Sequence, residues 1–211
     1  MFVGVNMKPT RKVSPPSPVA AWLNRSIIPV IWRTDADPAV LARARVIFVQ
    51  GCELAELPVI LDWLRSGPCA RIPIMVHVDL LAGLSSDDAG LRYLAGLRRI
   101  DGIITVRAHM VGAARRLGLA SILLLFLQDG RSIDRGLHII EQSRPDAIEL
   151  VPGVAALETA AHFEHLTIPR IAGGLVRSPA TVRKLLDAGF DAVSSSSADL
   201  WKLNPEKPAA S

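Results

Sequence analysis

The chain has 211 residues, half of them hydrophobic, and a formal net charge of +4. This length suffices for one large core but excludes two full-sized domains. No run of eighteen or more apolar residues is free of charges, so we expect no membrane-spanning helix, and the first residues lack the order of a secretory signal. Cys52 and Cys69 have no metal-ligand or redox spacing, so we expect two buried thiols in a cytoplasmic protein.

The N-terminal segment 1–26 differs from the rest of the chain in charge and composition. It is rich in Pro and Ser and has no acidic residue, while the remainder is formally neutral. Its basic residues are Lys8, Arg11, Lys12 and Arg25. Such a segment can follow a nucleic-acid backbone, but its composition favours a solvated, flexible extension. We therefore expect a tail over 1–26, one domain over 27–203 and a short C-terminal tail over 204–211.

Eight short apolar runs follow the tail. They are rich in Ile and Val and do not alternate with polar residues, which is typical of strands covered on both faces in a parallel sheet. The runs are residues 27–32, 45–50, 72–78, 102–106, 121–127, 146–151, 168–172 and 191–195. Amphipathic segments of helical period lie between them, so the pattern predicts a TIM-type (β/α) barrel. The links after the first and fourth runs look short, so one degenerate unit, an incomplete barrel or an open doubly wound sheet stay as alternatives.

Polar residues gather where the predicted strands end. In a β/α-barrel these ends share one face, and ligands bind there. His77 and Asp79 are two residues apart, so both are expected to point into the barrel. Asp79 could orient His77, both could bind ligand hydroxyls, or the two could form a satisfied buried pair. Glu149 could join them around a metal, but nothing in the sequence fixes their separation, and we predict no metal.

The seventh and eighth runs end in residues with small side chains that leave backbone N–H groups accessible. Loops at these two positions often form a phosphate site in such barrels, helped by a helix N-terminus. We therefore predict an anion site between the two loops. Its expected contacts are Gly173, Gly174, Arg177, Ser195 and Ser196. In the alternative interpretation, the glycines only form a turn and the serines only fill a narrow barrel end.

Five segments of the chain occur together in one order: "IPIMVHVDLLAGL", "DGIITVRAHMVGAARRLGL", "PDAIELVPG", "IPRIAGGLVRS" and "LLDAGFDAVSSSSADLW". In order and spacing they resemble the glycerol uptake operon antiterminator regulatory proteins, over about residues 27–203. The resemblance implies a TIM-type barrel that is not an enzyme and needs no cofactor. It further implies that glycerol 3-phosphate is the effector and that the partner is the leader mRNA of glycerol-utilisation genes, whose early termination the protein prevents.

The resemblance also implies roles for individual positions. It places the phosphate of glycerol 3-phosphate between the loops at 173–174 and 194–197. The other positions that match the family's motifs are His77, Asp79 and Glu149, expected near the hydroxyl groups of the ligand, and Thr105, Arg107 and Arg177.

The chain departs from the family's pattern in three places. Leu123 and Leu124 stand where the family usually has Gln-Arg, so a contact to phosphate or RNA could be lost. Trp32 interrupts the usual Ile-Arg at the end of the first strand. Ser196 and Ser197 replace the usual Thr and Asn.

These departures keep a second function open: an enzyme acting on a small phosphorylated substrate. In that case His77 or Asp79 would be the general acid or base, with Glu149 as its partner. The fold does not decide between the two functions, because barrels host many chemistries. The formally neutral body shows no obvious basic stripe for RNA, and the sequence leaves open both the RNA surface and a homo-oligomeric state.

Overall fold

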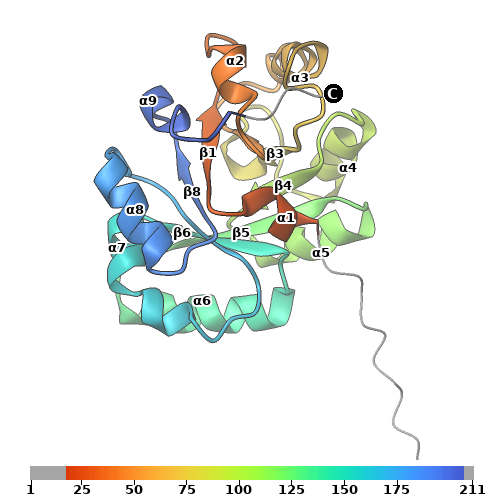
Figure 1. Cartoon of the computed structure of the whole chain (residues 1–211). Coiled ribbons are helices and arrows are strands. Elements are labelled where there is room, and N and C mark those ends of the chain that lie inside the picture. The colour runs from red at the N-terminus through yellow and green to blue at the C-terminus, as the bar shows by residue number, and fades with distance from the viewer. Residues whose placement is uncertain (1–17, 207–211) are drawn as a thin grey trace, which may run out of the picture.

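The computed structural model describes residues 18–206, which form a closed barrel of eight parallel strands (Figure 1). Each strand pairs with the next in sequence, and β8 pairs with β1. The predicted TIM-type barrel is confirmed, and the sheet is closed rather than incomplete or open. The strands are β1 (Ser26–Ile31), β2 (Ile47–Val49), β3 (Ile74–His77), β4 (Gly102–Thr105), β5 (Ala120–Phe126), β6 (Ala147–Val151), β7 (Arg170–Ala172) and β8 (Ala192–Ser195).

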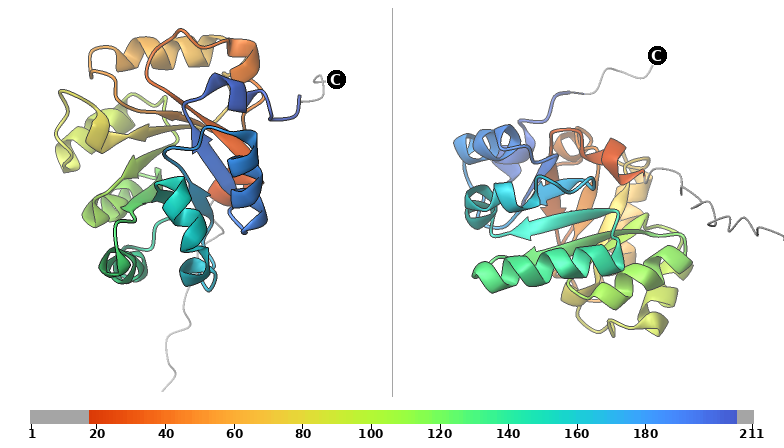
Figure 2. Two further views of the ribbon diagram at one scale, coloured as in Figure 1. Left: turned by 90° about the vertical axis from the view of Figure 1, so that its left-hand side faces the viewer. Right: turned by 90° about the horizontal axis from the view of Figure 1, so that it is seen from below.

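Helices surround the barrel on its outside (Figure 2). They are α1 (Val19–Leu23), α2 (Pro38–Leu41), α3 (Leu57–Ser66), α4 (Asp88–Gly96), α5 (Ala108–Arg116), α6 (Gly130–Ser143), α7 (Gly153–Glu158), α8 (Pro179–Asp187) and α9 (Ala198–Trp201), with 3₁₀ turns η1 (Val78–Leu80) and η2 (Ala160–Phe163). The first unit is the reduced one, because α2 has only four residues. The unit after β4 is ordinary, since α5 has nine. None of the helices between residues 18 and 206 is long and apolar enough to cross a bilayer.

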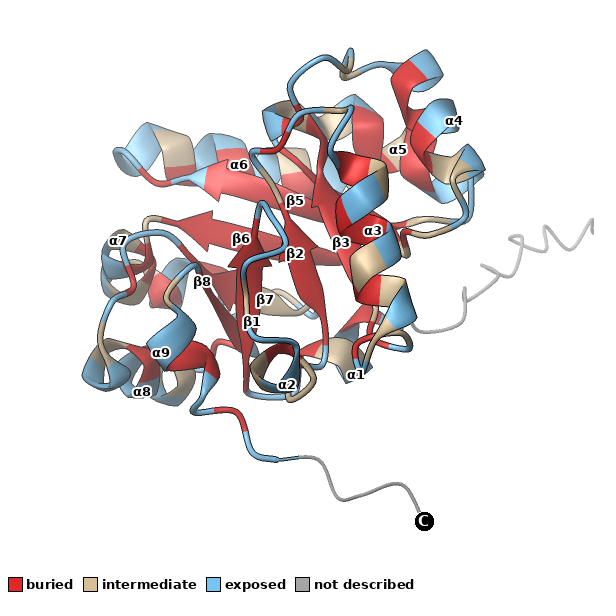
Figure 3. Ribbon diagram, turned by 90° about the horizontal axis from the view of Figure 1, so that it is seen from above, coloured by how far each residue is buried: buried red, intermediate tan, exposed pale blue. Residues whose placement is uncertain are grey.

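The strands separate two apolar cores, one inside the barrel and one beneath the helices. Ile28, Phe48 and Met75 belong to the inner core, whereas Ile27, Ile47 and Ile74 pack outward. The strands are therefore buried on both faces, as the unbroken apolar runs predicted (Figure 3). Both cysteines are buried and neither forms a disulfide within the described chain, which confirms the expectation of two buried thiols.

Helix α1 closes the N-terminal opening of the barrel. Val19 and Leu23 are fully buried and belong to the inner core. The tail predicted over 1–26 therefore extends too far, because five of its residues form a packed helix and β1 already begins at Ser26. Residues 1–17 of that predicted tail lie outside the described part of the chain.

The C-terminal boundary also lies later than predicted. Asn204, assigned to the tail, is buried. Its Oδ1 accepts a hydrogen bond from the Ile27 amide at 2.9 Å, and its Nδ2 donates to the Ile27 carbonyl at 2.7 Å. The side chain thus completes the hydrogen bonding of a residue in β1, so the folded unit includes Asn204.

Three aspartates link neighbouring strands at the N-terminal end of the barrel. Each directly precedes an even-numbered strand, and its Oδ2 accepts a backbone N–H near the start of the preceding odd-numbered strand at 2.8 Å. The pairs are Asp101 with Ile74, Asp146 with Ser121, and Asp191 with Arg170. In each pair the amide of the aspartate also donates to the same partner's carbonyl. The sequence elements "DGI", "DAI" and "DAV" therefore mark one repeated structural bond.

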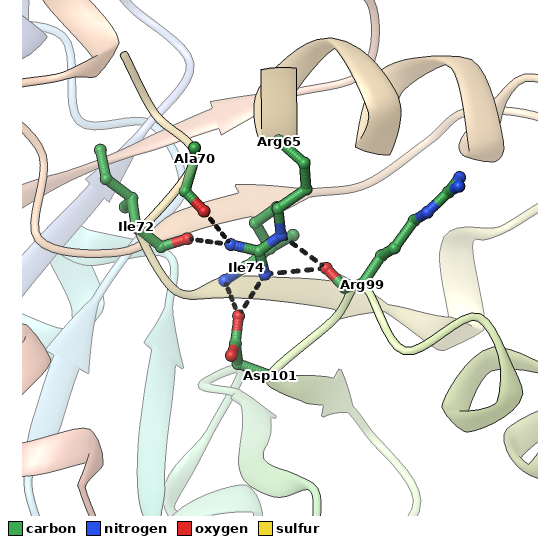
Figure 4. A network of polar contacts seen from close by, with 6 residues as sticks. All are labelled: Arg65, Ala70, Ile72, Ile74, Arg99 and Asp101. Carbon is green, nitrogen blue, oxygen red and sulfur yellow. Dashed lines mark hydrogen bonds and ion pairs between the residues drawn. The ribbon is translucent and has the colours of Figure 1, made fainter. Parts of the chain in front are cut away.

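The Asp101 position is reinforced by a half-buried arginine, Arg65 (Figure 4). Arg65 donates to Asp101 Oδ2 at 2.7 Å and to the carbonyls of Ala70, Ile72 and Arg99. One guanidinium thus satisfies three carbonyls of the loops that follow α3 and α4.

Candidate functional site

A cavity of about 720 Å³ opens at the C-terminal ends of the strands. Its walls come from the ends of all eight strands or from the loops that follow them, as expected for the ligand site of a β/α-barrel. The lining residues are Val30, Gln50, His77, Asp79, Leu80, Val106, Leu124, Phe126, Glu149, Val151, Gly174, Leu175, Val176, Arg177, Ser194, Ser195, Ser196 and Ser197.

Glu149 lies in the wall of this cavity, on β6. Its Oε1 accepts a hydrogen bond from Ser194 Oγ at 2.5 Å. Burial raises the pKa of Glu149 to about 7, although the bond from Ser194 opposes the shift. The carboxyl group is therefore half protonated near neutral pH and can donate as well as accept a hydrogen bond.

Gly173 makes room for this pair of side chains. A Cβ at Gly173 would lie 2.2 Å from Ser194 Oγ and 2.4 Å from Glu149 Oε1. Its amide donates to the Leu150 carbonyl at 3.0 Å, and the residue is not part of the cavity lining. Packing therefore requires a glycine at position 173. Its amide, which we expected to contact the anion, is hydrogen-bonded within the protein.

His77 occupies the end of β3 and is almost fully buried, with 3 % of its surface exposed. Burial lowers its pKa, and the nearby charge of Asp79 opposes this shift only in part, so the ring is neutral at pH 7. Within residues 18–206, Nδ1 has no hydrogen-bond partner. A buried ring nitrogen beside a cavity is suited to a ligand hydroxyl, because an unpaired buried polar atom is costly.

Asp79, on η1, is held by the loop after β4. Its Oδ2 accepts hydrogen bonds from Thr105 Oγ1 and the Val106 amide, both at 2.8 Å. Arg107 Nε lies 3.0 Å from Oδ1, close enough for an ion pair but not aligned as a hydrogen bond. Thr105 and Arg107 do not line the cavity, so both position Asp79 instead.

The loop after β7 lines the cavity with residues 174–177. Gly174 and Leu175 both have positive φ, +70° and +58°, a backbone turn of the kind in which successive N–H groups can bind an anion. Among the described residues, no protein acceptor receives the N–H of Gly174, Leu175, Val176 or Arg177. The exposed guanidinium of Arg177 adds a positive charge to the same loop.

The loop after β8 lies against the loop after β7. Ser195 Oγ donates to the Val176 carbonyl at 3.1 Å and accepts from the Ser197 amide at 3.2 Å, while the Ser195 carbonyl accepts from Trp201 Nε1 at 2.7 Å. Ser195 therefore joins the two loops. Ser196 is exposed at the cavity and keeps its hydroxyl for another partner.

The predicted site residues thus fall into two groups. Seven line the cavity: His77, Asp79, Glu149, Gly174, Arg177, Ser195 and Ser196. The other three, Thr105, Arg107 and Gly173, support residues that do. Their contact with a ligand stays a prediction. The four remaining histidines are exposed and lie outside the cavity lining: His109, His138, His162 and His165.

Sequence reasoning missed the apolar part of the site. Leu80, Val106, Phe126 and Leu175 line the rim, and all four are large exposed hydrophobic side chains. They continue the apolar runs of the strands or follow them directly, so in the sequence they look like core residues. Only the closed barrel shows that they lie at the cavity. Among the described residues, no cluster of His, Cys, Asp or Glu is suited to a metal ion.

The fold and this cavity define a β/α-barrel with an anion-suited site at the C-terminal end of its strands. A model of the family described as glycerol-3-phosphate responsive antiterminators matches residues 27–201. The chain belongs to this family, as the resemblance of its motifs implied.

Two solved structures agree with this assignment, and one curated protein is similar in sequence. The glycerol uptake operon antiterminator regulatory protein of Listeria monocytogenes is 27% identical, with a TM-score of 0.73 over 85% of this chain and 96% of that one. A glycerol uptake operon antiterminator-related protein of Thermotoga maritima is 26% identical, with a TM-score of 0.73 over 84% and 98%. The uncharacterized protein YgcP of Escherichia coli is 36% identical over 128 residues, which are 61% of this chain and 67% of YgcP.

Proposed function

We propose that this protein is a cytoplasmic, glycerol 3-phosphate-responsive transcription antiterminator that binds leader mRNA and has no enzymatic activity. The observation that carries the proposal is the run of unbonded amides from Gly174 to Arg177 at one wall of the cavity. Successive N–H groups beside an arginine are typical of phosphate sites. Membership of the family named for its response to glycerol 3-phosphate supports this ligand.

In this proposal the phosphate lies on the amides of the loop after β7, near Arg177 and Ser196. The glycerol hydroxyls reach the polar groups at the base of the cavity, His77 and Glu149. The two carboxyl groups of the site do not exclude an anion. Asp79 is paired with Arg107, and Glu149 is partly protonated because its pKa is raised to about 7.

A thermal-shift experiment tests the phosphate site. We expect glycerol 3-phosphate to raise the Tm by several degrees and glycerol to leave it unchanged, since only the former occupies the amides. An equal response to both compounds would contradict the site.

A matched pair of glycine variants locates that response. Gly174 and Gly118 have nearly the same positive φ, +70° and +72°, and Gly118 lies outside the cavity lining. Gly174→Leu and Gly118→Leu therefore carry a similar backbone strain of about 1 kcal/mol. We expect only Gly174→Leu to lose the Tm response to glycerol 3-phosphate. Loss in both variants, or in neither, is incompatible with phosphate binding at this loop.

A mobility shift with the leader transcript of the glycerol-uptake operon tests the RNA partner. At low salt, contacts to RNA phosphates are strongest, so binding is expected there, and glycerol 3-phosphate is expected to tighten it. Absence of a shift at low salt would remove the antiterminator function.

The raised pKa of buried Glu149 favours one other candidate, an enzyme that uses it as general acid or base on a phosphorylated substrate. Phosphorus and carbon NMR of glycerol 3-phosphate incubated with the protein separates the two. We expect an unchanged spectrum, and conversion that Glu149→Gln abolishes would favour the enzyme.

A further inference from the structure

The charged residues of the loops are sorted between the two ends of the barrel. We call the loops that lead from a helix into a strand the αβ face: residues 24–25, 42–46, 67–73, 97–101, 117–119, 144–146, 164–169 and 188–191. The loops that leave the strands are the βα face: residues 32–37, 50–56, 78–87, 106–107, 127–129, 152, 173–178 and 196–197. The cavity opens on the βα face.

The two faces differ in sign. The αβ face has seven arginines and four acidic residues: Arg25, Arg43, Arg45, Arg71, Arg98, Arg99 and Arg144 against Asp101, Asp146, Glu164 and Asp191. The βα face has three arginines and seven acidic residues: Arg33, Arg107 and Arg177 against Asp35, Asp37, Glu53, Glu56, Asp79, Asp87 and Asp129. The formal charges are thus +3 and −4, a difference that the formally neutral sum over residues 27–211 conceals.

Several arginines of the αβ face have side chains that form no ion pair within the described chain. Arg45, Arg71, Arg98 and Arg144 are exposed, and none has an acidic partner between residues 18 and 206. Arg115, in the last turn of α5, donates to the carbonyls of Ser143 and Arg144 and so lies beside this group. The aspartates of the face are engaged, because Asp101, Asp146 and Asp191 accept strand amides.

Most acidic residues of the βα face have partners in the fold. Asp37, Asp87 and Asp129 are helix N-caps that accept amides of α2, α4 and α6. Their charge nevertheless remains near the cavity mouth, where it repels a polyanion.

We propose that RNA binds the αβ face, at the end of the barrel opposite the effector cavity. The proposal rests on the antiterminator function proposed above. An RNA backbone gains counterion release where exposed arginines outnumber acids, and Arg is suited to bidentate contact with phosphate. The described chain also begins at this face, since α1 closes the same end of the barrel. Three basic residues precede it in sequence: Lys8, Arg11 and Lys12.

The chemistry of the face indicates how RNA is recognised. The exposed large aromatic side chains of the described residues, Trp32, Tyr93 and Phe126, lie outside the αβ face. Among the exposed side chains of the face only His165 has an aromatic ring, so the face offers little surface on which bases can stack. Binding proceeds through phosphates, so we expect a steep dependence on salt and recognition of RNA shape rather than of individual bases.

Two double variants that remove the same charge test this surface. Arg71→Gln/Arg98→Gln lowers the formal charge of the αβ face from +3 to +1, and Arg33→Gln/Arg131→Gln removes two positive charges at the opposite end. The dissociation constant for the leader transcript is measured at several KCl concentrations. We expect about tenfold weaker binding for the αβ double variant, with a slope of log K against log [salt] smaller by about 1.4, as for two lost single-strand phosphate contacts. The control double variant is expected to bind like the wild type.

The outcomes separate this proposal from the function on which it rests. If the wild type does not bind the transcript, the antiterminator function fails. If the wild type binds and both double variants weaken binding equally, or the control weakens it more, RNA does not use the αβ face. Retention of the Tm response to glycerol 3-phosphate in the αβ double variant verifies that the variant is folded.

Discussion

Glu149 carries a proton over a pH range in which an ordinary glutamate has lost it. Its pKa of about 7 lies above the ordinary 4.5 because the group is buried. Between these two values the folded protein binds more protons than the unfolded chain, so folding stability falls as pH rises. The shift corresponds to at most about 3 kcal/mol. The glutamine in Glu149→Gln cannot ionise. We therefore expect the free energy of unfolding of this variant to change by about 3 kcal/mol less than that of the wild type between pH 5 and pH 8.

Urea denaturation of both proteins across this range measures the effect. His77 has a lowered pKa and so changes stability in the opposite direction below its ordinary pKa, but it is present in both proteins and cancels in the difference. Glu158→Gln, at an exposed position on α7, serves as the matched control. Parallel stability curves for wild type and Glu149→Gln would show that the carboxyl group is not protonated in the fold.

The same residues show how far the sequence predicts a site. The positions of the double glycine and the serines could be predicted, because they end apolar runs. Their individual roles could not be predicted. Gly173 is a glycine because side chains from β6 and β8 leave no room for a Cβ, and Ser195 donates a hydrogen bond to a carbonyl of the loop after β7. Contacts between segments distant in sequence decide which amide remains free.

At the scale of elements, the three aspartates before β4, β6 and β8 have equivalent backbone contacts but different side-chain surroundings. Asp101 also accepts from Arg65, whereas Asp191 accepts only the Arg170 amide through its side chain. Asn is similar in shape but lacks the charge. We expect Asp101→Asn to lower the free energy of unfolding by about 2 kcal/mol and Asp191→Asn by about 1 kcal/mol or less. Urea denaturation at pH 7 compares the two, and a larger loss for Asp191→Asn would be incompatible with the network around Arg65.

All eight strands could be predicted from their apolar runs, because strands buried on both faces leave an unbroken Ile- and Val-rich signal. Helix α1 could not. It has five residues, follows a Pro- and Ser-rich segment, and is stabilised by packing into the barrel opening rather than by its own sequence. The closed form of the sheet likewise became clear only from the pairing of β8 with β1.

At the scale of the whole molecule, the barrel separates the effector cavity from the proposed RNA surface. The cavity lies at one end of the strands and the proposed RNA surface at the other. The formal charge is −4 on the loops of the βα face and +3 on the loops of the αβ face. The effector therefore does not touch the RNA in this arrangement. Any influence of one on the other has to pass through the strands and helices between them, as a change in the populations of two states of the protein.

Linkage makes this arrangement testable. If glycerol 3-phosphate tightens RNA binding by a certain factor, saturating RNA must tighten glycerol 3-phosphate binding by the same factor, which is typically 5- to 150-fold, or about 1–3 kcal/mol. Calorimetric titration of the effector with and without the leader transcript measures one side, and RNA titration with and without the effector measures the other. The Arg71→Gln/Arg98→Gln variant should bind the effector like the wild type when RNA is absent, because these arginines lie outside the cavity lining. If RNA instead lowers the affinity of the protein for glycerol 3-phosphate, the two ligands compete for one surface. That result would place RNA over the cavity mouth.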